Sequence, residues 1–216
     1  MKGLLKNNFY AVRSSAKTLA VFMLLLGAFV TVVVSQQLLF FYMLLGIIGF
    51  SVNAAASMGK DYISKWGRYK LTLPVRRVDI VKSYFIEQLL WLLVGMIFAG
   101  AGMGLSWLFH GCPFDRGIDA LMLFSAGSSI SLFAGAIFFP LFYIGGEERN
   151  GAFLAISLLC AVGIVMGITT LINGMFGPGM TTVQTVLAAM LLLACSLMAF
   201  VLSYPVTTAI FERKEY

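Results

Sequence analysis

The residues best suited to catalysis are few, and they do not form a complete active site. The chain has one histidine, His110, which lies close to Cys112 and Asp115. A catalytic zinc ion usually takes three protein ligands, so a solvated loop is a simpler interpretation of these residues than a metal site. Glu147 and Glu148 form an acidic pair like that of membrane-embedded proteases, but those enzymes also need histidines on later helices, and none follows. The sequence predicts no catalytic residue, no metal site and no cofactor bound by this chain.

The sequence also offers little for binding a nucleotide or carrying a proton. No GxxxxGK[ST] motif occurs, so the chain has no P-loop with which to bind ATP. Glu87 is the charged residue nearest to the middle of an apolar segment, and a structural role there is favoured over a proton carrier. If this protein moves a solute, we expect the energy to come from a separate chain.

The composition indicates the class of protein in which these residues lie. The chain has 216 residues, of which 60% are hydrophobic and 11% are charged. An ordinary soluble domain is about 25% charged, so this sequence has too few charges to cover a water-facing surface. The composition excludes a soluble globular enzyme, a disordered tail and a secreted disulfide scaffold. It predicts one all-α integral membrane domain over residues 1–216.

The gaps between charged residues predict six transmembrane helices. A helix needs roughly 20 apolar residues to cross the hydrocarbon core, and the two longest gaps are each long enough for two crossings. Ser35-Gln36-Gln37 supplies the turn within the first of these gaps, and the Gly-rich segment at 173–179 supplies it within the last. The predicted spans are residues 18–34, 38–57, 86–108, 121–144, 152–171 and 183–204, and the fourth span is expected to bend near Pro140.

The distribution of Lys and Arg predicts the orientation. With these spans, all but one of the fifteen Lys and Arg residues lie on the same side, and the exception is Arg116. The positive-inside rule places the basic side, and with it both chain termini, in the cytoplasm. The net charge of +6 then reflects membrane insertion rather than nucleic-acid binding. We expect a multi-pass protein of the bacterial plasma membrane with no nucleic-acid partner.

The first seventeen residues are amphipathic. Leu5, Phe9, Val12 and Ala16 recur at helical spacing, while the basic residues of this segment occupy another face. This pattern is typical of an interfacial helix over residues 1–17 whose cations face anionic lipid. A plain positive-inside anchor explains the same residues equally well.

The connection at residues 59–83 is far longer than a helical hairpin requires. Tyr62, Trp66 and Tyr69 share one helix face, and Pro74 is suited to the first turn of a following helix. Aromatic and arginine side chains together are typical of a protein-binding surface. A basic loop that lies on lipid is the alternative.

A second connection on the same side contains Gly146, Glu147, Glu148 and Arg149. Acidic residues are not needed there to set the orientation, which positive charge determines. They either pair with a basic patch on a partner or simply solvate a turn.

The longer connection carries a family resemblance. Residues 65–83, KWGRYKLTLPVRRVDIVKS, resemble the signature of small ABC-2 type permeases, approximately W-x-x-Y-x-x-(S/T)-L-P-V-(S/T)-R-x-x-I-V-x-(S/A)-K. These permeases are the six-helix membrane subunits of bacterial ABC exporters of the type V kind. Residues 140–147 and the basic, aromatic end at 211–216 are also similar to the family. Arg76 stands where the family usually has a small hydroxyl residue, and Tyr84 where it usually has lysine.

The resemblance implies a division of labour between chains. ATP and Mg²⁺ would bind to a separate ATPase, and a second permease copy or a paralogous permease would complete the pore. The connection after the second span would be the coupling helix seated in the ATPase, and the connection after the fourth span would make a second contact. The ATPase-coupling residues are then Tyr62, Lys65, Trp66, Arg68, Tyr69, Pro74, Arg76, Arg77, Asp79, Gly146, Glu147, Glu148 and Arg149.

The cargo is the least determined feature. The polar candidates for a substrate path within the spans are Asn53, Ser125, Ser128, Ser129 and Ser131. The 19 Phe and 12 Met residues would suit hydrophobic or amphipathic cargo, and several members of the family export amphipathic peptides. The glycine pairs Gly100/Gly104 and Gly163/Gly167 could serve helix packing within the subunit or a dimer seam.

Two other classes of function stay open at this point. One is the vitamin-capturing membrane subunit of an energy-coupling-factor importer, which is also a small six-helix chain. The other is a membrane sensor or immunity component that docks a partner without transporting anything.

Overall fold

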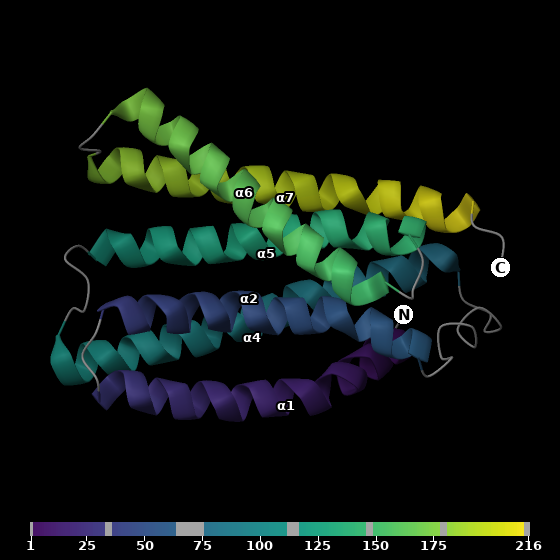
Figure 1. Cartoon of the computed structure of the whole chain (residues 1–216), viewed down its shortest axis with the longest axis horizontal. Coiled ribbons are helices and arrows are strands. Elements are labelled where there is room, and N and C mark those ends of the chain that lie inside the picture. Colours follow the sequence, from purple (N-terminus) through teal and green to yellow (C-terminus); the bar gives the residue numbers. More distant parts are fainter. Residues whose placement is uncertain are drawn as a thin grey trace.

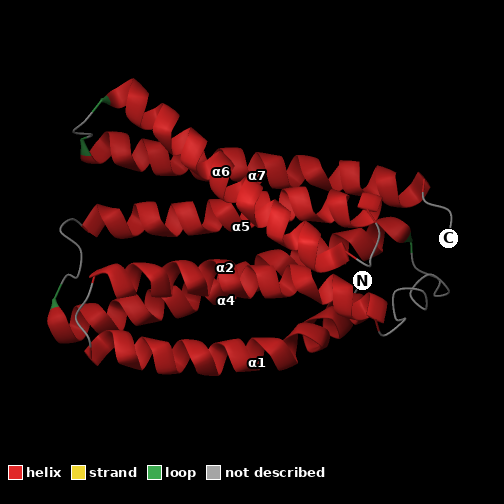
Figure 2. Ribbon diagram, viewed as in Figure 1, coloured by secondary structure: helices red, strands yellow, loops and turns green. Residues whose placement is uncertain are grey.

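The computed structural model shows six long helices among the residues it describes (Figure 1). It describes residues 2–32, 36–63, 76–111, 117–145, 149–177 and 181–213, and these contain no strand (Figure 2). Each helix is long and apolar enough to cross a membrane, which confirms the predicted six-span, all-α architecture. The helices are α1 (Lys2–Val32), α2 (Gln36–Ile63), α4 (Arg77–His110), α5 (Gly117–Gly145), α6 (Asn150–Phe176) and α7 (Thr182–Arg213).

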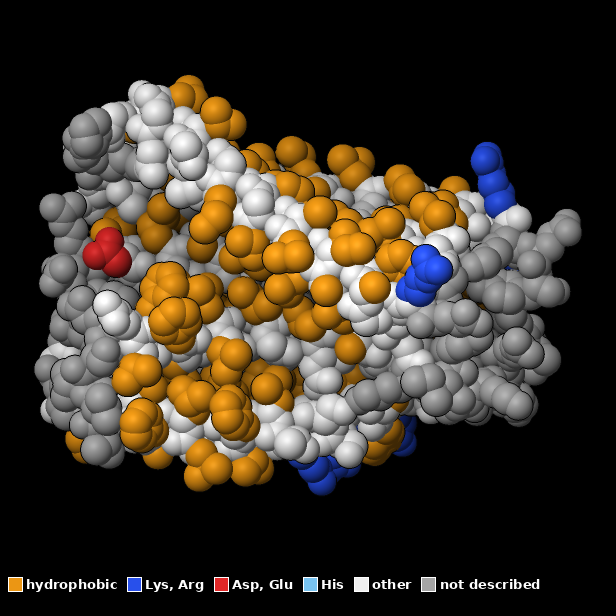
Figure 3. All heavy atoms as spheres, viewed as in Figure 1, with side chains coloured by type: hydrophobic (Ala, Val, Ile, Leu, Met, Phe, Trp, Pro, Cys, Tyr) orange, Lys and Arg blue, Asp and Glu red, His pale blue; other side chains and the backbone are white. Residues whose placement is uncertain are grey.

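The helices run up and down along one direction, and the two chain ends lie at the same end of the bundle (Figure 1). α2 packs most closely against α4, and α5 packs most closely against α7. α6 crosses α5 obliquely and diverges from α7 toward the opposite end (Figure 1). Apolar side chains cover the middle of the visible face, and the visible Lys and Arg side chains lie at its edges, most of them nearer the end with the termini (Figure 3). This distribution suits a bundle surrounded by lipid.

α1 is one continuous helix where the sequence predicted an interfacial helix over 1–17 and a span over 18–34. Its apolar face is covered by protein at the N-terminal end as well, because Val12 and Ala16 are buried. Asn8 Nδ2 donates a hydrogen bond to Ser83 Oγ of α4 at 3.0 Å, and the Phe9 ring stacks on Trp91 of α4. Since these contacts hold the first turns against α4, the helix continues without a break.

The α2–α4 contact is a close approach of two backbones. A Cβ atom on Gly95 of α4 would lie 2.6 Å from the carbonyl oxygen of Gly46 and 3.1 Å from the Cα atom of Ile47, both in α2. The same two helices are also joined by a hydrogen bond, which the Tyr42 hydroxyl of α2 donates to the Phe98 carbonyl oxygen of α4 at 3.1 Å. Small residues permit such packing in membranes, where helices associate through van der Waals contact and hydrogen bonds.

α5 is the most enclosed span, and it continues through Pro140. Proline has no N–H, so the Ala136 carbonyl loses the hydrogen bond that residue 140 would otherwise donate. Ser203 Oγ of α7 donates to that same carbonyl oxygen at 2.6 Å. The structure therefore satisfies the carbonyl from the neighbouring helix, as a lipid-surrounded helix requires.

This pairing gives a specific prediction for Ser203→Ala. The variant should lower the free energy of unfolding by about 1 kcal/mol, the upper part of the range for interhelical hydrogen bonds in membranes. In a Pro140→Ala background the new N–H can bond to Ala136 within α5, so the same change should then cost almost nothing. Unfolding of the four proteins in detergent measures this cycle. An equal cost of Ser203→Ala in both backgrounds would contradict the pairing.

Candidate functional site

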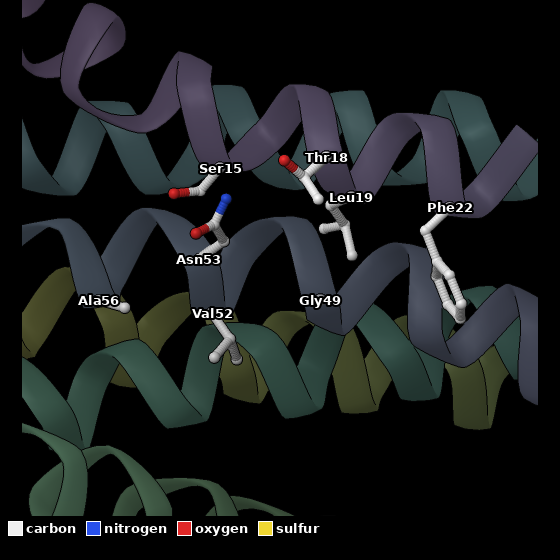
Figure 4. Close-up of a pocket in the computed structure, with 8 residues that line it drawn as sticks. All are labelled: Ser15, Thr18, Leu19, Phe22, Gly49, Val52, Asn53 and Ala56. Atoms are coloured by element: carbon white, nitrogen blue, oxygen red, sulfur yellow. The ribbon is translucent and has the colours of Figure 1, made fainter.

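A groove runs between α1 and α2, and its first part is partly polar. It encloses about 660 Å³ and opens between the two helices (Figure 4). Each helix contributes four residues at the i, i+3, i+4 and i+7 positions of one face, so two helical stripes face each other. The lining residues are Ser15, Thr18, Leu19, Phe22, Gly49, Val52, Asn53 and Ala56.

The second part of the groove is apolar and encloses about 770 Å³. It shares Phe22, Gly49 and Val52 with the first part, so the two parts form one continuous depression, which we name the α1–α2 groove. α2 forms its floor, Phe22, Leu26 and Phe29 of α1 form one wall, and Leu158 of α6 lies on the other side. Phe22, Phe29 and Phe41 are 50%, 58% and 67% exposed, so this part of the groove is open to the surroundings of the bundle. An elongated molecule with a polar end and an apolar body matches this shape.

The polar end of the groove offers one amide in particular. Asn53 Nδ2 is buried and has no hydrogen-bond partner among the described residues. The Asn53 side chain points toward α1, on the side of Ser15 (Figure 4). Thr18 Oγ1 donates to the Ser14 carbonyl of its own helix at 3.4 Å. An acceptor group placed between these helices would compensate the desolvation of the Asn53 amide.

The five residues predicted to line a substrate path are not brought together. Asn53 alone lies in the α1–α2 groove. Ser131 Oγ donates to Ser51 Oγ of α2, and Ser196 Oγ of α7 donates to Ser129 Oγ at 3.2 Å. Ser131 thus joins α5 to α2, and Ser129 joins α5 to α7. The reason is that a hydroxyl surrounded by lipid and protein must find its partner inside the bundle.

The remaining two predicted serines face a different depression. Ser125 and Ser128 donate to the carbonyls of Met122 and Phe124 in their own helix, at 2.8 and 2.7 Å. They border an apolar depression of about 630 Å³ between α4, α5 and α7. Because their hydroxyls are satisfied locally, they add little polarity to it.

Four of the predicted coupling residues have described side chains, and these lie at the starts of α4 and α6. Arg76 is exposed and immediately precedes α4, Asp79 lies in the first turn of α4, and Arg149 is exposed before α6. Arg77 is partly buried, and its guanidinium bonds to the end of α7. Tyr62 belongs to α2, and its side chain is not among those described. The coupling residues outside the described residues are Lys65, Trp66, Arg68, Tyr69, Pro74, Gly146, Glu147 and Glu148.

Several buried polar side chains of α4 lie in its first half. Glu87 and Gln88 are 3% and 2% exposed, and Gln88 Nε2 donates to the Ser131 carbonyl oxygen at 2.9 Å. Ser83 Oγ donates to the Ile80 carbonyl oxygen one turn away. No cluster of three potential metal ligands occurs among the described residues. The bonds from Asn8 to Ser83 and from Gln88 to Ser131 join α4 to α1 and α5.

Six apolar helices and a lateral groove both suit a transport subunit. The family model described as ABC-2 family transporter protein matches residues 3–212, nearly the whole chain. The chain belongs to this ABC-2 family. No curated protein and no solved structure matches it.

As an ABC-2 permease the chain is a multi-pass membrane subunit of an ABC transporter, and the family implies association with an ABC ATPase. The resemblance at residues 65–83 is thereby confirmed at the level of the family. Groove residues other than Asn53 were missed in the sequence because Ser15 and Thr18 lie where the interfacial segment was expected to join the first span. The signal that could have found them is the pair of matching stripes at i, i+3, i+4 and i+7 in α1 and α2.

Proposed function

We propose that this permease is the transport subunit of an ATP-driven exporter of hydrophobic or amphipathic molecules, such as amphipathic peptides. The observation that carries the proposal is the α1–α2 groove, with its polar end at Asn53 and its apolar length along Phe22 and Phe29. None of the described residues that line it is charged. An uncharged aromatic lining favours apolar surface over ions, because an ion would lose its hydration without compensation.

A second permease subunit completes the path in this proposal. The groove is open on one side, so a single chain supplies only part of an enclosed pathway. α6, which borders the groove, is the least buried helix, and Gly163 and Gly167 on it have open space beside them. Small residues permit a close approach of another helix. A second copy, or a paralogous permease, placed against α1 and α6 would close the groove.

The energy comes from the ATPase through the two connections at the end of the bundle with the termini. By the positive-inside rule this is the cytoplasmic end, in the plasma membrane of a bacterium. Closure of the ATPase on Mg²⁺-ATP would move residues 59–83 and 145–151 together. The helices would then pass from an inward-open to an outward-open arrangement. Anionic lipid beside the exposed Lys6, Arg13 and Lys17 of α1 would hold this end at the interface.

The direct test is transport in inside-out proteoliposomes that contain the permease and the ABC ATPase recovered with it from native membranes. We expect ATP-dependent accumulation of a fluorescent amphipathic helical peptide. A peptide of the same composition, scrambled so that it has no apolar face, should accumulate far less. A non-hydrolysable ATP analogue is the control for energy coupling.

Other results would lead to other functions. Accumulation in right-side-out vesicles alone would overturn the export direction. No movement of either peptide, with the ATPase still bound, would favour a sensor or immunity component. A vitamin-capturing importer subunit is not proposed, since the chain belongs to the ABC-2 family.

Trp66→Ala should separate ATP hydrolysis from transport. An aromatic anchor in a protein interface commonly contributes about 2 kcal/mol, so transport per ATP should fall on the order of 30-fold. Trp107→Ala is the matched control, because Trp107 is 59% exposed near the opposite end of α4. The measurement is peptide transport and phosphate release in the same vesicles. If both tryptophan variants transport normally, residues 59–83 do not transmit the ATPase motion.

A further inference from the structure

The start of α4 is tied to the end of α7 by one arginine. Arg77 Nη1 donates to the carbonyl oxygens of Phe211 and Glu212, both at 3.2 Å. The guanidinium carbon also lies 5.6 Å from the centroid of the Phe211 ring. The last carbonyls of a helix have no partner within the helix, and a cation is favoured there by the helix dipole. Arg77 therefore caps α7 from a residue 134 positions away in the sequence.

The same turn of α7 also contacts the end of α5. The rings of Phe211 and Tyr143 have centroids 4.7 Å apart, and these side chains are 4% and 6% exposed. Tyr143 lies in the last turn of α5, which ends at Gly145. The connection from α5 to α6 begins directly after this turn. Phe211 thus touches the helix that follows the first predicted coupling connection and the helix that precedes the second.

We propose that the last turn of α7, through Phe211, links the two coupling connections so that they move as one unit, and that Arg77 is a positioning residue in this link. This inference rests on the proposed function, in which both connections contact the ATPase. Close-packed contacts transmit small displacements because they leave no free volume to absorb them. Arg77 then acts through α7, whereas its neighbour Arg76 is exposed and remains available to the ATPase.

The physical link can be measured without the ATPase. Hydrogen exchange of the permease in lipid nanodiscs reports protection of the last turn of α7 and the last turn of α5. Arg77→Ala should speed exchange in both turns by about fivefold or more, since it removes a charge-assisted pair of hydrogen bonds. Arg76→Ala is the matched control and should leave both turns unchanged, while Arg77→Lys should restore part of the protection. Unchanged exchange in Arg77→Ala would overturn the link.

The functional consequence is measured in vesicles that contain the ATPase. Arg77→Ala should move at least about tenfold less peptide for each ATP hydrolysed, a change of about 1.4 kcal/mol. Phe211→Leu keeps an apolar side chain but removes the ring that both partners contact, and it should give the same loss if Arg77→Ala fails to fold. Normal transport per ATP in variants with faster exchange would overturn the coupling role. If the wild-type permease transports no peptide, the proposed function is wrong. The hydrogen-exchange experiment would still show whether Arg77 links the last turns of α7 and α5.

Discussion

Gly95→Val should prevent α2 and α4 from packing and leave little folded permease. The nearest atoms to a Cβ at this position are the Gly46 carbonyl oxygen at 2.6 Å and the Ile47 Cα at 3.1 Å. Both belong to the backbone, so no side-chain rotation can relieve the clash, and the helices must separate. Overpacking against side chains costs about 1–3 kcal/mol, and we expect a backbone clash at this contact to cost at least the upper value. Thermal unfolding in detergent and recovery from membranes measure the effect.

Gly104→Val in the same helix is the control for the Gly95 variant. A Cβ at Gly104 has no neighbour within 4 Å, so the added side chain only extends into open space. Both variants make the same change in helix propensity within α4, and any difference between them comes from tertiary packing. If Gly95→Val unfolds at the same temperature as Gly104→Val, the close approach of α2 and α4 is absent.

The number and type of the helices were predictable because they depend on local composition. Each apolar run lacks charges over the width of a bilayer, and no run has an alternative to a helix there. The helices extend beyond the predicted spans where charged residues flank an apolar run, because a span is only the part of a helix within the hydrocarbon core. α4 begins at Arg77 and continues through the predicted span at residues 86–108, since charges such as Asp79 are tolerated in the first turn at the interface.

The helix contacts could not be predicted in the same way. The sequence motif points to Gly100/Gly104 and Gly163/Gly167, but the structure brings two backbones close together at Gly46 and Gly95. GxxxG spacing shows that two glycines share a face and contains no information about which helix lies opposite. In the same way the serines of α5 suggested a polar path, and two of them instead bond to α2 and α7. Both outcomes depend on the tertiary arrangement, which a single sequence does not encode in any short motif.

The site was predicted only in part for the same reason. Asn53 was recognised because a polar side chain within a span is costly and therefore conspicuous. Its neighbours in the groove are small, hydroxyl or apolar residues such as Gly49 and Thr18, which are common in any membrane helix. They form a groove only because α1 and α2 lie side by side in the folded chain.

Gly49→Phe should close the α1–α2 groove and stop transport while the permease remains folded. Gly49 lies where the polar and apolar parts of the groove meet. A Cβ there would be 3.6 Å from Leu19 Cδ2, an ordinary contact, so a larger side chain can leave the backbone without a clash and extend into the groove. We expect ATP-dependent transport of the amphipathic peptide to fall at least about tenfold, the change given by 1.4 kcal/mol. The unfolding temperature and the capture of the ATPase should stay close to those of the wild type.

Two control variants distinguish blockage of the groove from a general effect of a larger side chain. Gly49→Ala adds only the atom that already fits, so it should transport the peptide at nearly the wild-type rate. Gly163→Phe places the same ring on α6, where a Cβ has open space, and outside the residues that line the groove. If only Gly163→Phe blocks transport, then transport depends on the contact of α6 with the second subunit rather than on the groove. If Gly49→Phe transports normally, the cargo does not pass along the groove. If only Gly49→Phe loses transport, the cargo passes along the groove between the polar end at Asn53 and the aromatic wall of α1. Of the substituted rings, only the one at residue 49 lies between these two parts.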